Sequence, residues 1–483
     1  MKARVVGLPE KERQKSLKYS ILDGAAFSAT TGFGNSFIQP FAIALGLNNI
    51  QIGFLSSIPS LITAVSQVFS ARLLDVVKNR KKLMLRFALL HGLMWIPIIF
   101  IPFFWAELAG IYLIAFVSIY ALFDSMIWPV WMSFMGDLVK RDEEGRYFGK
   151  RNEITGLVAL FSSFTAGMIL SYFTGSIFIG FAVIFFIAMA ARFISLFFLT
   201  KQIEPEYEFS ETAYFSVTDF LKRMPESNFG KFVAFKSLLS FAMNIASPFF
   251  IVYMLRDLHL SYFYFTVIIS ASALTNIFSM PYWGKLADRY GNKHVMTACA
   301  ALIPLYPILW LFSIDPLWLI LVQMFGGFVF SGFDLTAANF IFDSTSAPKR
   351  ARCTAYLYLF EGIAVFAGAL TGGFLATFLP KLFFVSNLIT LFLVSAVLRG
   401  TVIASLVNSF KEKRLDLEEI PERKLFWTVV AVEPMHGLKR ELKVIERFFV
   451  DNTKAIEREI EKDGKTAVGG FRKIIKKRKR KKK

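Results

Sequence analysis

A short charged turn separates two apolar runs at residues 284–293, where the sequence reads GKLADRYGNK. The runs on either side, 262–283 and 294–313, are each roughly 20 residues long, which is enough for an α-helix to cross a hydrocarbon core of about 30 Å. Gly284 and Gly291 bracket the charged residues, and glycine adopts tight backbone conformations that other residues resist. This pattern predicts two membrane helices joined by a tight polar connection.

The same alternation of apolar run and charged connection continues from Tyr19 to about Val407. The chain has 483 residues, of which 55% are hydrophobic, and a mean hydropathy of +0.51. This composition excludes the class of soluble globular proteins. We therefore expect an all-α membrane protein with twelve membrane helices, at 20–46, 51–77, 83–105, 108–136, 152–174, 177–199, 231–255, 262–283, 294–313, 317–342, 353–378 and 381–407.

Basic residues gather in every second connection between these runs. They occur in residues 1–19, 78–82, 140–151, 201–223, 285–293 and 349–352, whereas the intervening connections carry almost none. Because cytoplasmic loops hold the excess of Lys and Arg, we expect a multi-pass protein of the cell membrane with both termini in the cytoplasm. Two termini on one side require an even number of spans.

A repeated spacing divides the chain into two halves. Four residues recur 206 positions later, namely Asp137, Arg146, Gly156 and Gly167, which return as Asp343, Arg352, Gly362 and Gly373. Many transporters consist of two such repeats. We expect a cytoplasmic segment at 1–19, six-helix bundles at 20–200 and 231–410, a cytoplasmic linker at 201–230 and a basic cytoplasmic tail at 411–483.

The turn at 284–293 resembles the G-x-L-[AS]-D-R-x-G-[RK] signature of the major facilitator superfamily, and the resemblance covers about residues 20–407. It implies two six-helix halves that rock about a central cavity. It also implies that Gly284, Asp288, Arg289 and Gly291 form a gate on the cytoplasmic side, with Asp288 facing the start of the fifth helix near Arg151. A charged turn shaped only by the preference for positive charge inside is the alternative.

The equivalent turn of the first half, residues 71–81, departs from the signature. It keeps Asp75 and a trailing basic residue but lacks both glycines and the arginine that follows the acid. The resemblance implies that Asp75 faces the start of the eleventh helix near Arg352, and the repeated residue Arg146 belongs to the same predicted gate.

Three carboxyl groups fall deep inside predicted membrane helices. Asp334 and Glu361 lie about 14 Å from the cytoplasmic ends of their helices, and Asp124 lies a few ångströms further along. Ionisable groups at this depth are costly and commonly face a cavity or a partner. We predict that they couple transport to protons or bind a cation, and the alternative is a structural acid. Asp23 is predicted at the membrane interface.

Further polar residues within the predicted helices fall into three groups, namely possible substrate contacts, two repeated arginines and one histidine. The resemblance places the first, fourth, seventh and tenth helices around the cavity, which adds Asn35, Gln39, Trp128, Asn244 and Asn339 as substrate contacts, although such residues also hold helices together. Arg192 and Arg399, 207 positions apart, are predicted to extend toward the membrane interface. His91 is predicted as a packing residue with satisfied hydrogen bonds.

Small residues recur at every fourth position in two predicted helices, at Ala159, Ser163, Gly167 and Ser171 and at Ala364, Gly368, Gly372 and Ala376. Such stripes permit close approach of helix backbones. We interpret them as the seam between the two halves, and static packing is the alternative.

The C-terminal tail carries 23 Lys and Arg against 13 Asp and Glu. We expect its last eight residues, 476–483, to attract anionic lipid headgroups and expect no nucleic-acid partner. A short strand is predicted at 426–432 and an amphipathic helix at 438–460.

The sequence contains a partial match to one enzyme motif but not a complete one. The triplet Gly464-Lys465-Thr466 resembles the end of a phosphate-binding loop, but its first glycine would fall at Glu459. Four scattered histidines do not favour a metal site, and we expect no cofactor. The predicted function is secondary active transport of a neutral or cationic small solute by a monomer, coupled to protons. An uncoupled facilitator and a non-transporting receptor or scaffold are the alternatives.

Overall fold

The computed structural model describes residues 8–77, 79–140, 143–205, 216–381 and 386–412. The chain divides into two units, Met1–Leu417 and Glu418–Lys483, and every described residue belongs to the first. The described residues form helices and short connections without a β-strand. The strand predicted at 426–432, the helix predicted at 438–460 and the basic residues at 476–483 lie outside them.

The first half consists of long helices, some of them built from two or three consecutive segments. In chain order these are α1 Glu10–Thr30, the π-helix η1 Thr31–Asn35 and α2 Ser36–Ala44; α3 Asn49–Val77; α4 Arg80–Leu93 and α5 Trp95–Phe104; η2 Ala106–Leu108 and α6 Ala109–Leu138; α7 Glu144–Tyr172; η3 Thr174–Ser176 and α8 Ile177–Lys201.

The second half follows a short connecting helix, α9 Val217–Arg223, and has the same organisation. Its segments are α10 Asn228–Asn244, α11 Ser247–Val252 and the π-helix η4 Tyr253–Asp257; α12 Tyr262–Tyr290; α13 Asn292–Leu302 and α14 Leu305–Leu309; α15 Pro316–Ser344; α16 Ala347–Phe378; α17 Asn387–Leu406.

Nine helical stretches among the described residues are long and apolar enough to cross a membrane. They coincide with the predicted third to eighth and tenth to twelfth spans, so the all-α membrane class is confirmed. The other three predicted spans are also helical, at residues 10–44, Asn49–Val77 and 292–309, but they do not meet the same criterion. The total of twelve therefore stays a prediction.

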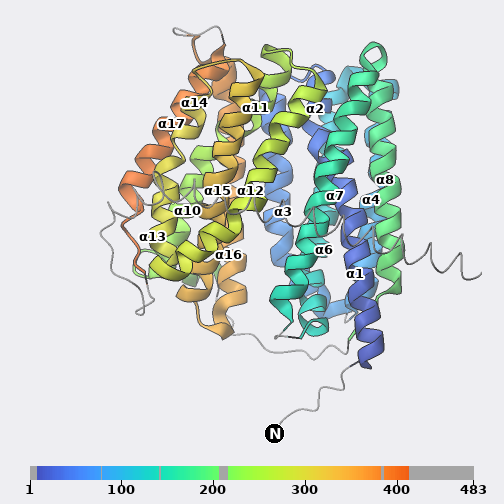
Figure 1. Ribbon diagram of the computed structural model, residues 1–483, viewed down its shortest axis with the longest axis vertical. Helices are drawn as coiled ribbons and strands as arrows, with labels where there is room; N and C mark the ends of the chain where they lie inside the picture. The colour runs from blue at the N-terminus through green and yellow to red at the C-terminus, as the bar shows by residue number, and fades with distance from the viewer. Residues whose placement is uncertain (1–7, 78, 141–142, 206–215, 382–385, 413–483) are drawn as a thin grey trace, which may run out of the picture. The chain divides into compact units, whose positions relative to one another are not determined.

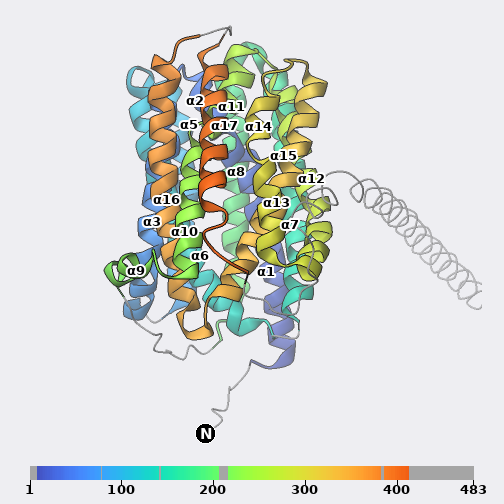
Figure 2. The ribbon, with the colours of Figure 1, turned by 90° about the vertical axis from the view of Figure 1, so that its left-hand side faces the viewer.

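Figure 1 shows the helices of the first half on the right and those of the second half on the left. Two pairs of helices join them, because α3 packs along α16 and α7 packs against α12. Figure 2 shows α9 at the lower end, beside the ends of the long helices. The halves thus meet mainly along these two helix pairs, with further contacts of α11 with α2 and α3.

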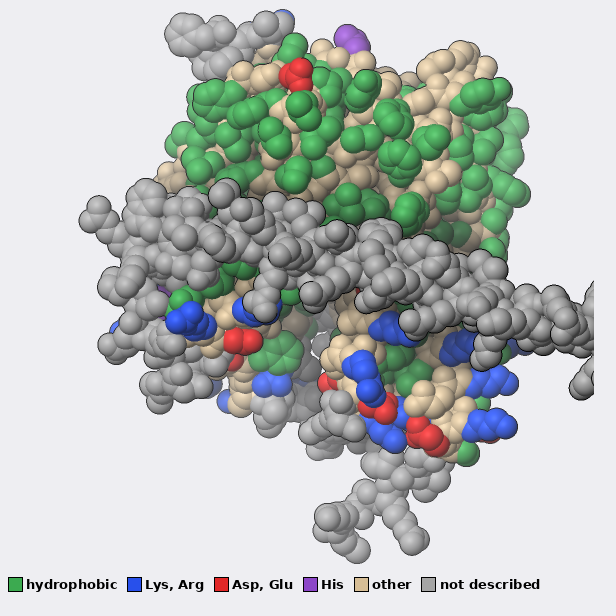
Figure 3. Space-filling view, in the orientation of Figure 1, with side chains coloured by type: hydrophobic (Ala, Val, Ile, Leu, Met, Phe, Trp, Pro, Cys, Tyr) green, Lys and Arg blue, Asp and Glu red, His purple; other side chains and the backbone are tan. Residues whose placement is uncertain are grey.

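The two ends of the helix bundle differ in charge. Figure 3 shows apolar side chains over the upper part of the visible face and Lys, Arg, Asp and Glu gathered at the lower end. We call this lower end, where α1, α4, α7 and α13 begin, the basic end, and we call the other the opposite end. Large apolar side chains such as Phe104, Phe161 and Val397 are exposed between them, as expected for a surface that faces lipid.

Side chains at helix starts satisfy backbone groups that lack partners within the helix. The Asn79 side chain accepts a hydrogen bond from the Lys82 N–H at 2.7 Å, and the Asp315 carboxylate accepts one from the Leu317 N–H at 2.7 Å. These caps set where α4 and α15 begin. Gly291, with φ 92°, lies directly after α12 and ends it, as the glycine of the motif predicts.

The seventh helical stretch is broken between α10 and α11, and α17 binds the main-chain carbonyls near this break. The Ser395 hydroxyl donates to the Ala242 carbonyl at 2.7 Å, and the Arg399 guanidinium donates to the Met243 carbonyl at 3.2 Å. Freed carbonyls inside a membrane protein need such partners. The prediction that Arg399 extends to the interface is wrong, because its side chain is only 1% exposed.

Glycines allow the two halves to touch. A Cβ added to Gly53 would lie 2.9 Å from the Ala369 carbonyl oxygen, and one added to Gly362 would lie 2.2 Å from Ala64 Cβ. In the predicted stripe of α16, by contrast, Gly368 and Gly372 face carbonyls of α10 and its end within the second half. The seam prediction is therefore wrong for these two glycines.

Close packing inside the second half gives a matched pair of variants. A Cβ at Gly327 of α15 would lie 2.3 Å from the Ser272 carbonyl oxygen of α12, whereas one at Gly400 of α17 would meet nothing within 4 Å. We expect Gly327→Ala to destabilise the protein by about 1–3 kcal/mol through overpacking. Gly400→Ala should leave the thermal unfolding midpoint in detergent unchanged or slightly raised. Equal midpoints for the two variants would contradict the packing of α12 on α15.

Candidate functional site

A cavity of about 410 Å³ lies among α1, α3, α6, α7 and α8 of the first half and α16 of the second. The residues that line it all fall between the midpoint of their helical stretch and the basic end. Its walls combine two acids, two arginines and several aromatic rings, namely Asp23, Asp124, Arg151, Arg192, Phe27, Trp128, Trp131 and Tyr358. The cavity is therefore charged and aromatic, and it lies toward the basic end.

One wall is organised by a buried acid and a buried arginine. The Ser195 hydroxyl donates to Asp23 Oδ1 at 2.6 Å, and the Gln202 amide donates to Asp23 Oδ2 at 3.3 Å. Arg192 donates to the same Ser195 oxygen at 3.0 Å, and its guanidinium lies 4.8 Å from the centre of the Phe27 ring. Both side chains are buried. The prediction that Arg192 extends toward the membrane interface is therefore wrong. The interfacial depth of Asp23 stays a prediction, since its partner Gln202 lies just beyond the end of α8.

Asp124 of α6 lies at the cavity and has 43% of its side chain exposed. Its Oδ1 is 3.8 Å from Nε2 of the fully buried His91 on α4. The His91 ring packs against the Tyr120 ring with 3.9 Å between centroids, but neither of its nitrogens has a hydrogen-bond partner among the described residues. His91 packs as predicted, but its hydrogen-bonding groups are not satisfied.

Aromatic side chains form the cavity wall nearer the basic end. Trp128 is 55% exposed, and its ring stacks on Trp131 with 5.4 Å between centroids. The Arg151 guanidinium lies 4.4 Å from the centre of the Trp131 ring, a cation–π geometry. Tyr358 of α16 contributes a ring from the other half. Flat apolar surfaces therefore adjoin the charged groups.

The two predicted coupling acids of the second half, Asp334 and Glu361, belong to a separate group of side chains. Lys236 Nζ lies 3.1 Å from Glu361 Oε2, and the Ser240 hydroxyl donates to Glu361 Oε1 at 3.0 Å. Asp334 of α15 is within electrostatic reach of Lys236 and Glu361. The three predicted coupling acids are thus divided between the halves, and their roles stay predictions.

The predicted substrate contacts do not share one location. Trp128 lines the cavity. The Tyr120 hydroxyl donates to Asn35 Oδ1, the Gln39 amide donates to the Pro248 carbonyl of α11, and the Asn244 amide donates to a carbonyl of its own helix at 2.8 Å. Asn339 is half-buried on α15. A direct role in substrate binding stays a prediction for these residues.

Three hydrogen bonds between the halves, within the part of the chain that the structure describes, lie near the opposite end. Besides the bond from Gln39 to Pro248, the Asn49 amide donates to the Ala376 carbonyl at 2.9 Å, and the Phe263 N–H donates to the Ser171 hydroxyl at 3.0 Å. The cavity lies on the other side of these contacts, toward the basic end.

The residues of the predicted gate lie at the basic end. Asp288 and Arg289 are exposed at the end of α12, with the Arg289 guanidinium 5.1 Å from the Tyr290 ring centre. Arg146 is exposed at the start of α7, and Arg352 is half-buried in α16. Asp75 belongs to α3, but its side chain is outside the described part of the chain. The gating role of these residues stays a prediction.

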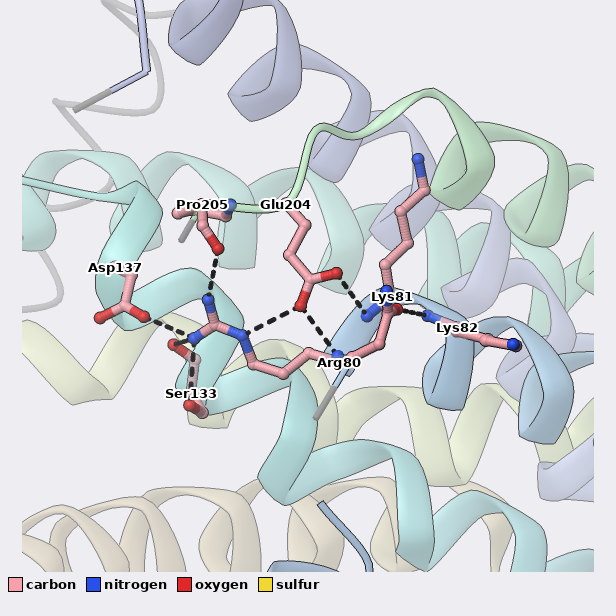
Figure 4. Close-up of polar contacts among 8 residues, drawn as sticks. Arg80, Lys81, Lys82, Ser133, Asp137, Glu204 and Pro205 are labelled. Atoms are coloured by element: carbon pink, nitrogen blue, oxygen red, sulfur yellow. Dashed lines mark hydrogen bonds and ion pairs between the residues drawn. The ribbon is translucent and has the colours of Figure 1, made fainter. Parts of the chain in front are cut away.

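A buried arginine joins α4 and α6 to the connection that follows α8, at the basic end of the first half (Figure 4). Arg80, at the start of α4, is fully buried and forms an ion pair with Asp137 of α6. Its guanidinium also donates to the carbonyls of Ser133 and Pro205 at 3.1 and 3.0 Å, and its backbone N–H donates to Glu204 Oε1 at 2.8 Å.

The second half repeats the same connections with different side chains. The Asn292 amide donates to Asp343 Oδ2 at 2.7 Å, and the Lys293 backbone N–H donates to Glu412 Oε2 at 2.8 Å. Asp137 and Asp343 therefore occupy equivalent places in the two halves. The predicted tail also begins in contact with the bundle, because Asn228 and Lys411 exchange two hydrogen bonds.

The Arg80 cluster provides a stability test. Arg80→Met keeps much of the side-chain volume but leaves Asp137 and the carbonyls of Ser133 and Pro205 without their partner, so we expect a loss of about 2 kcal/mol. The thermal unfolding midpoint in detergent should fall. The control is Lys82→Met, because the Lys82 side chain is exposed and its removal should change little. A midpoint unchanged by Arg80→Met would contradict the cluster.

The two glycines of the 284–293 turn have different requirements. Gly291 has φ 92° and ψ 152°, a conformation that residues with a Cβ rarely adopt, whereas a Cβ at Gly284 would first meet Leu335 at 3.9 Å. We expect Gly291→Ala to cost about 1–3 kcal/mol, and Gly284→Ala to be tolerated. Thermal unfolding of both variants tests this difference, and an equal loss would show that the motif needs both glycines for conformation.

Comparisons with known proteins agree with this architecture. The family model of the Major Facilitator Superfamily matches residues 23–231 and 232–451. The multi-drug resistance efflux pump PmrA of Streptococcus pneumoniae is 34% identical over 121 residues, which are 25% of this chain and 29% of that one. The tetracycline resistance protein, class B, of Escherichia coli is 28% identical over 129 residues, 26% of this chain and 32% of the other. The match thus spans about a third of these relatives.

Solved structures share the fold at low sequence identity. The nucleoside transporter NupG has a TM-score of 0.62 and 14% identity, over 83% of this chain and 99% of that one. A bacterial homolog of the human lysosomal transporter Spinster, in an inward-facing and occupied conformation, has a TM-score of 0.58 and 12% identity, over 83% and 95% of the two chains. Because the family model matches most of the sequence, the chain belongs to the Major Facilitator Superfamily of membrane transporters.

Proposed function

We propose that this protein is a secondary active transporter that carries a small organic solute across the cell membrane by alternating access, driven by protons. The observation that carries the proposal is the cavity, which places Asp124 and Arg192 among membrane-length helices that consist mostly of apolar residues. Ionisable groups at membrane depth are expensive and usually belong to a substrate or ion pathway. A transport function accounts for the cost of keeping these ionisable side chains at membrane depth.

The contacts between the halves support alternating access. Near the opposite end three hydrogen bonds join the halves, each with a main-chain group as one partner, as at Gln39, Asn49 and Ser171. The cavity lies toward the basic end, so a solute would enter from that side in this state. Rocking of one half on the other, along seams such as Gly53 against Gly373, would expose the site to the opposite side.

Carboxyl groups support the proton part of the proposal. Asp124 is partly exposed to the cavity, so it can exchange a proton with cavity water. In the second half, Asp334 interacts electrostatically with the ion pair of Lys236 and Glu361. Exchange of a proton at one of these acids would change the local charge during the transport cycle, which is the requirement for coupling.

The composition of the cavity supports an amphipathic solute of neutral or positive charge. Rings of Phe27, Trp128 and Tyr358 offer flat apolar surfaces, and Asp124 offers an exposed carboxyl group beside them. Two partial relatives are named for multi-drug efflux and for tetracycline resistance, and both names fit molecules of this kind. We also propose that the basic end faces the cytoplasm, because the loops there hold the excess of Lys and Arg.

Transport by the purified protein in proteoliposomes tests the function. Solutes that raise the unfolding temperature in a ligand screen would be offered with and without an imposed pH gradient. We expect the gradient to accelerate uptake at least several-fold, and Asp124→Asn or Asp334→Asn to remove that acceleration.

The matched control for these variants is Glu107→Gln, because Glu107 is exposed at the opposite end. It should transport as the unchanged protein does. A flux that ignores both the pH gradient and the two Asp variants would show an uncoupled facilitator. No flux of any solute that binds would contradict the transport function.

A further inference from the structure

His91 presents an unusual combination of burial and missing partners. Its side chain is 0% exposed, and neither Nδ1 nor Nε2 has a hydrogen-bond partner within the described part of the chain. Leaving a buried polar group without a partner costs about 1–3 kcal/mol. A packing role would be filled at lower cost by an apolar side chain, so the imidazole itself requires an explanation.

Asp124 connects this histidine to the cavity. Its Oδ1 lies 3.8 Å from His91 Nε2, while 43% of the side chain is exposed. This separation is too long for a hydrogen bond, but a small rotation of the carboxyl group would close it. A proton from cavity water can therefore reach the histidine through the carboxyl group, whereas the buried ring has no direct access.

We propose that His91 and Asp124 share one exchangeable proton, and that its arrival or departure acts through Tyr120 on the contact between the two halves. The cavity water supplies the proton to the Asp124 carboxylate, which can share it with Nε2 of the neutral imidazole, and the same water takes it back. The proposal deepens the proposed proton coupling and rests on it for its role in transport.

The charged surroundings explain how one proton can change the structure. Arg192 of α8 interacts electrostatically with both His91 and Asp124, and Asp23 of α1 reaches Arg192 through Ser195. Tyr120 of α6 packs on the ring. The other neighbouring segments of α4 add no charge here, because α5 and residues 49–71 contain no ionisable side chain. A proton on the pair therefore removes the negative charge that Asp124 offers to Arg192.

A continuous set of contacts leads from the pair to the other half. The His91 ring packs on Tyr120, whose hydroxyl donates to Asn35 Oδ1. Asn35 is the last residue of the π-helix η1, and π-helical segments often occur at functional positions. Gln39, four residues further along, donates to the Pro248 carbonyl of α11 in the second half. Movement of the His91 ring can thus reach this contact.

The acids of the second half are less suited to this role. Glu361 already has two partners, the Lys236 ammonium and the Ser240 hydroxyl. Asp334 is exposed and interacts electrostatically with the same pair, and no unpartnered histidine accompanies it among the described residues. His91 and Asp124 combine an accessible carboxyl group with an unsatisfied buried base, so they are the better candidates for a shared proton.

A pH titration of the histidine ring tests the shared proton without knowledge of the solute. The chain contains only four histidines, so ¹⁵N-histidine NMR of the full chain in lipid nanodiscs can assign the His91 signal by its loss in His91→Asn. We expect Asp124→Asn to move the midpoint of the His91 titration by about one pH unit or more, because a carboxylate at this distance interacts strongly with the ring.

Two controls accompany this titration. Asp334→Asn should leave the His91 midpoint unchanged, and Asp124→Glu should restore the titration of the unchanged protein. Asp124 is partly exposed, so its variants are expected to fold, and their unfolding temperatures check this. A His91 signal that does not titrate between about pH 4 and pH 9, or that ignores Asp124→Asn, would overturn the shared proton.

Distance measurements test the connection to the second half. Spin labels at Glu107 and Ile314, both exposed at the opposite end, report the separation of the halves. We expect acidification to shift the distance distribution, and both His91→Asn and Tyr120→Phe to abolish the shift. Tyr120→Phe should leave the His91 signal able to titrate. A shift that persists in Tyr120→Phe would overturn the transmission.

The outcome is distinguishable from a failure of the proposed transport. A flux that ignores the pH gradient would contradict proton-driven transport, while a His91 midpoint that depends on Asp124 would still support the shared proton. In the converse case, the flux depends on the pH gradient but the His91 signal does not titrate. That result would support the proposed function and overturn this inference.

Discussion

The ion and hydrogen-bond group formed by Asp23, Ser195 and Arg192 is the interaction on which the first half depends. Three side chains from α1 and α8 bind each other inside the helix bundle, at the wall of the cavity. Removing either charge would leave the other buried with weaker compensation, from Asp124 for Arg192 or from Arg151 and Gln202 for Asp23, which is more costly than the loss of one surface ion pair. The group therefore ties α1 to α8 and also sets the charge of the cavity wall, so Asp124 is the acid left open to the cavity.

The two halves share a plan but use different chemistry inside it. Arg192 and Arg399 lie 207 positions apart, and both are buried beside a serine. Arg192 interacts with two carboxylates, whereas Arg399 donates to a main-chain carbonyl at the break between α10 and α11. One copy of the repeated arginine therefore belongs to the cavity and the other supports a broken helix. This division explains why the described cavity lies mainly in the first half.

The fold was accessible from the sequence because its determining features are local. Apolar runs of membrane length, alternating loop charge and the 206-residue spacing each require only counting along the chain, and Asp137 and Asp343 do occupy equivalent places. The candidate site was accessible only in part. Asp124 and Trp128 stand out as unusual residues in an apolar helix, but the partners of Asp124 come from α4 and α8, and their proximity depends on helix rotation.

A sequence signal for the pairing of His91 with Asp124 does exist. The helices α4–α5 and α6 form an antiparallel pair whose connection falls at residues 105–108, and the two residues lie at similar distances from it on either side. Residues at equal distance from such a turn share one depth, so a histidine and an acid could have been placed at the same level. Depth alone does not say which way each side chain points, because a rotation of about 100° per residue separates neighbours around a helix.

The same limit explains the misassigned seam of α16. A stripe at every fourth position identifies one face of the helix, and Gly368 and Gly372 do lie against backbone, but that backbone belongs to α10. Gly362 and Gly373, off this stripe, approach α3 of the first half. Helix α16 therefore needs small residues on two faces, one to pack within its own half and one to contact the other. A helix that packs closely on two neighbours carries glycine toward both, and spacing alone cannot tell the face that contacts its own half from the face that contacts the other half.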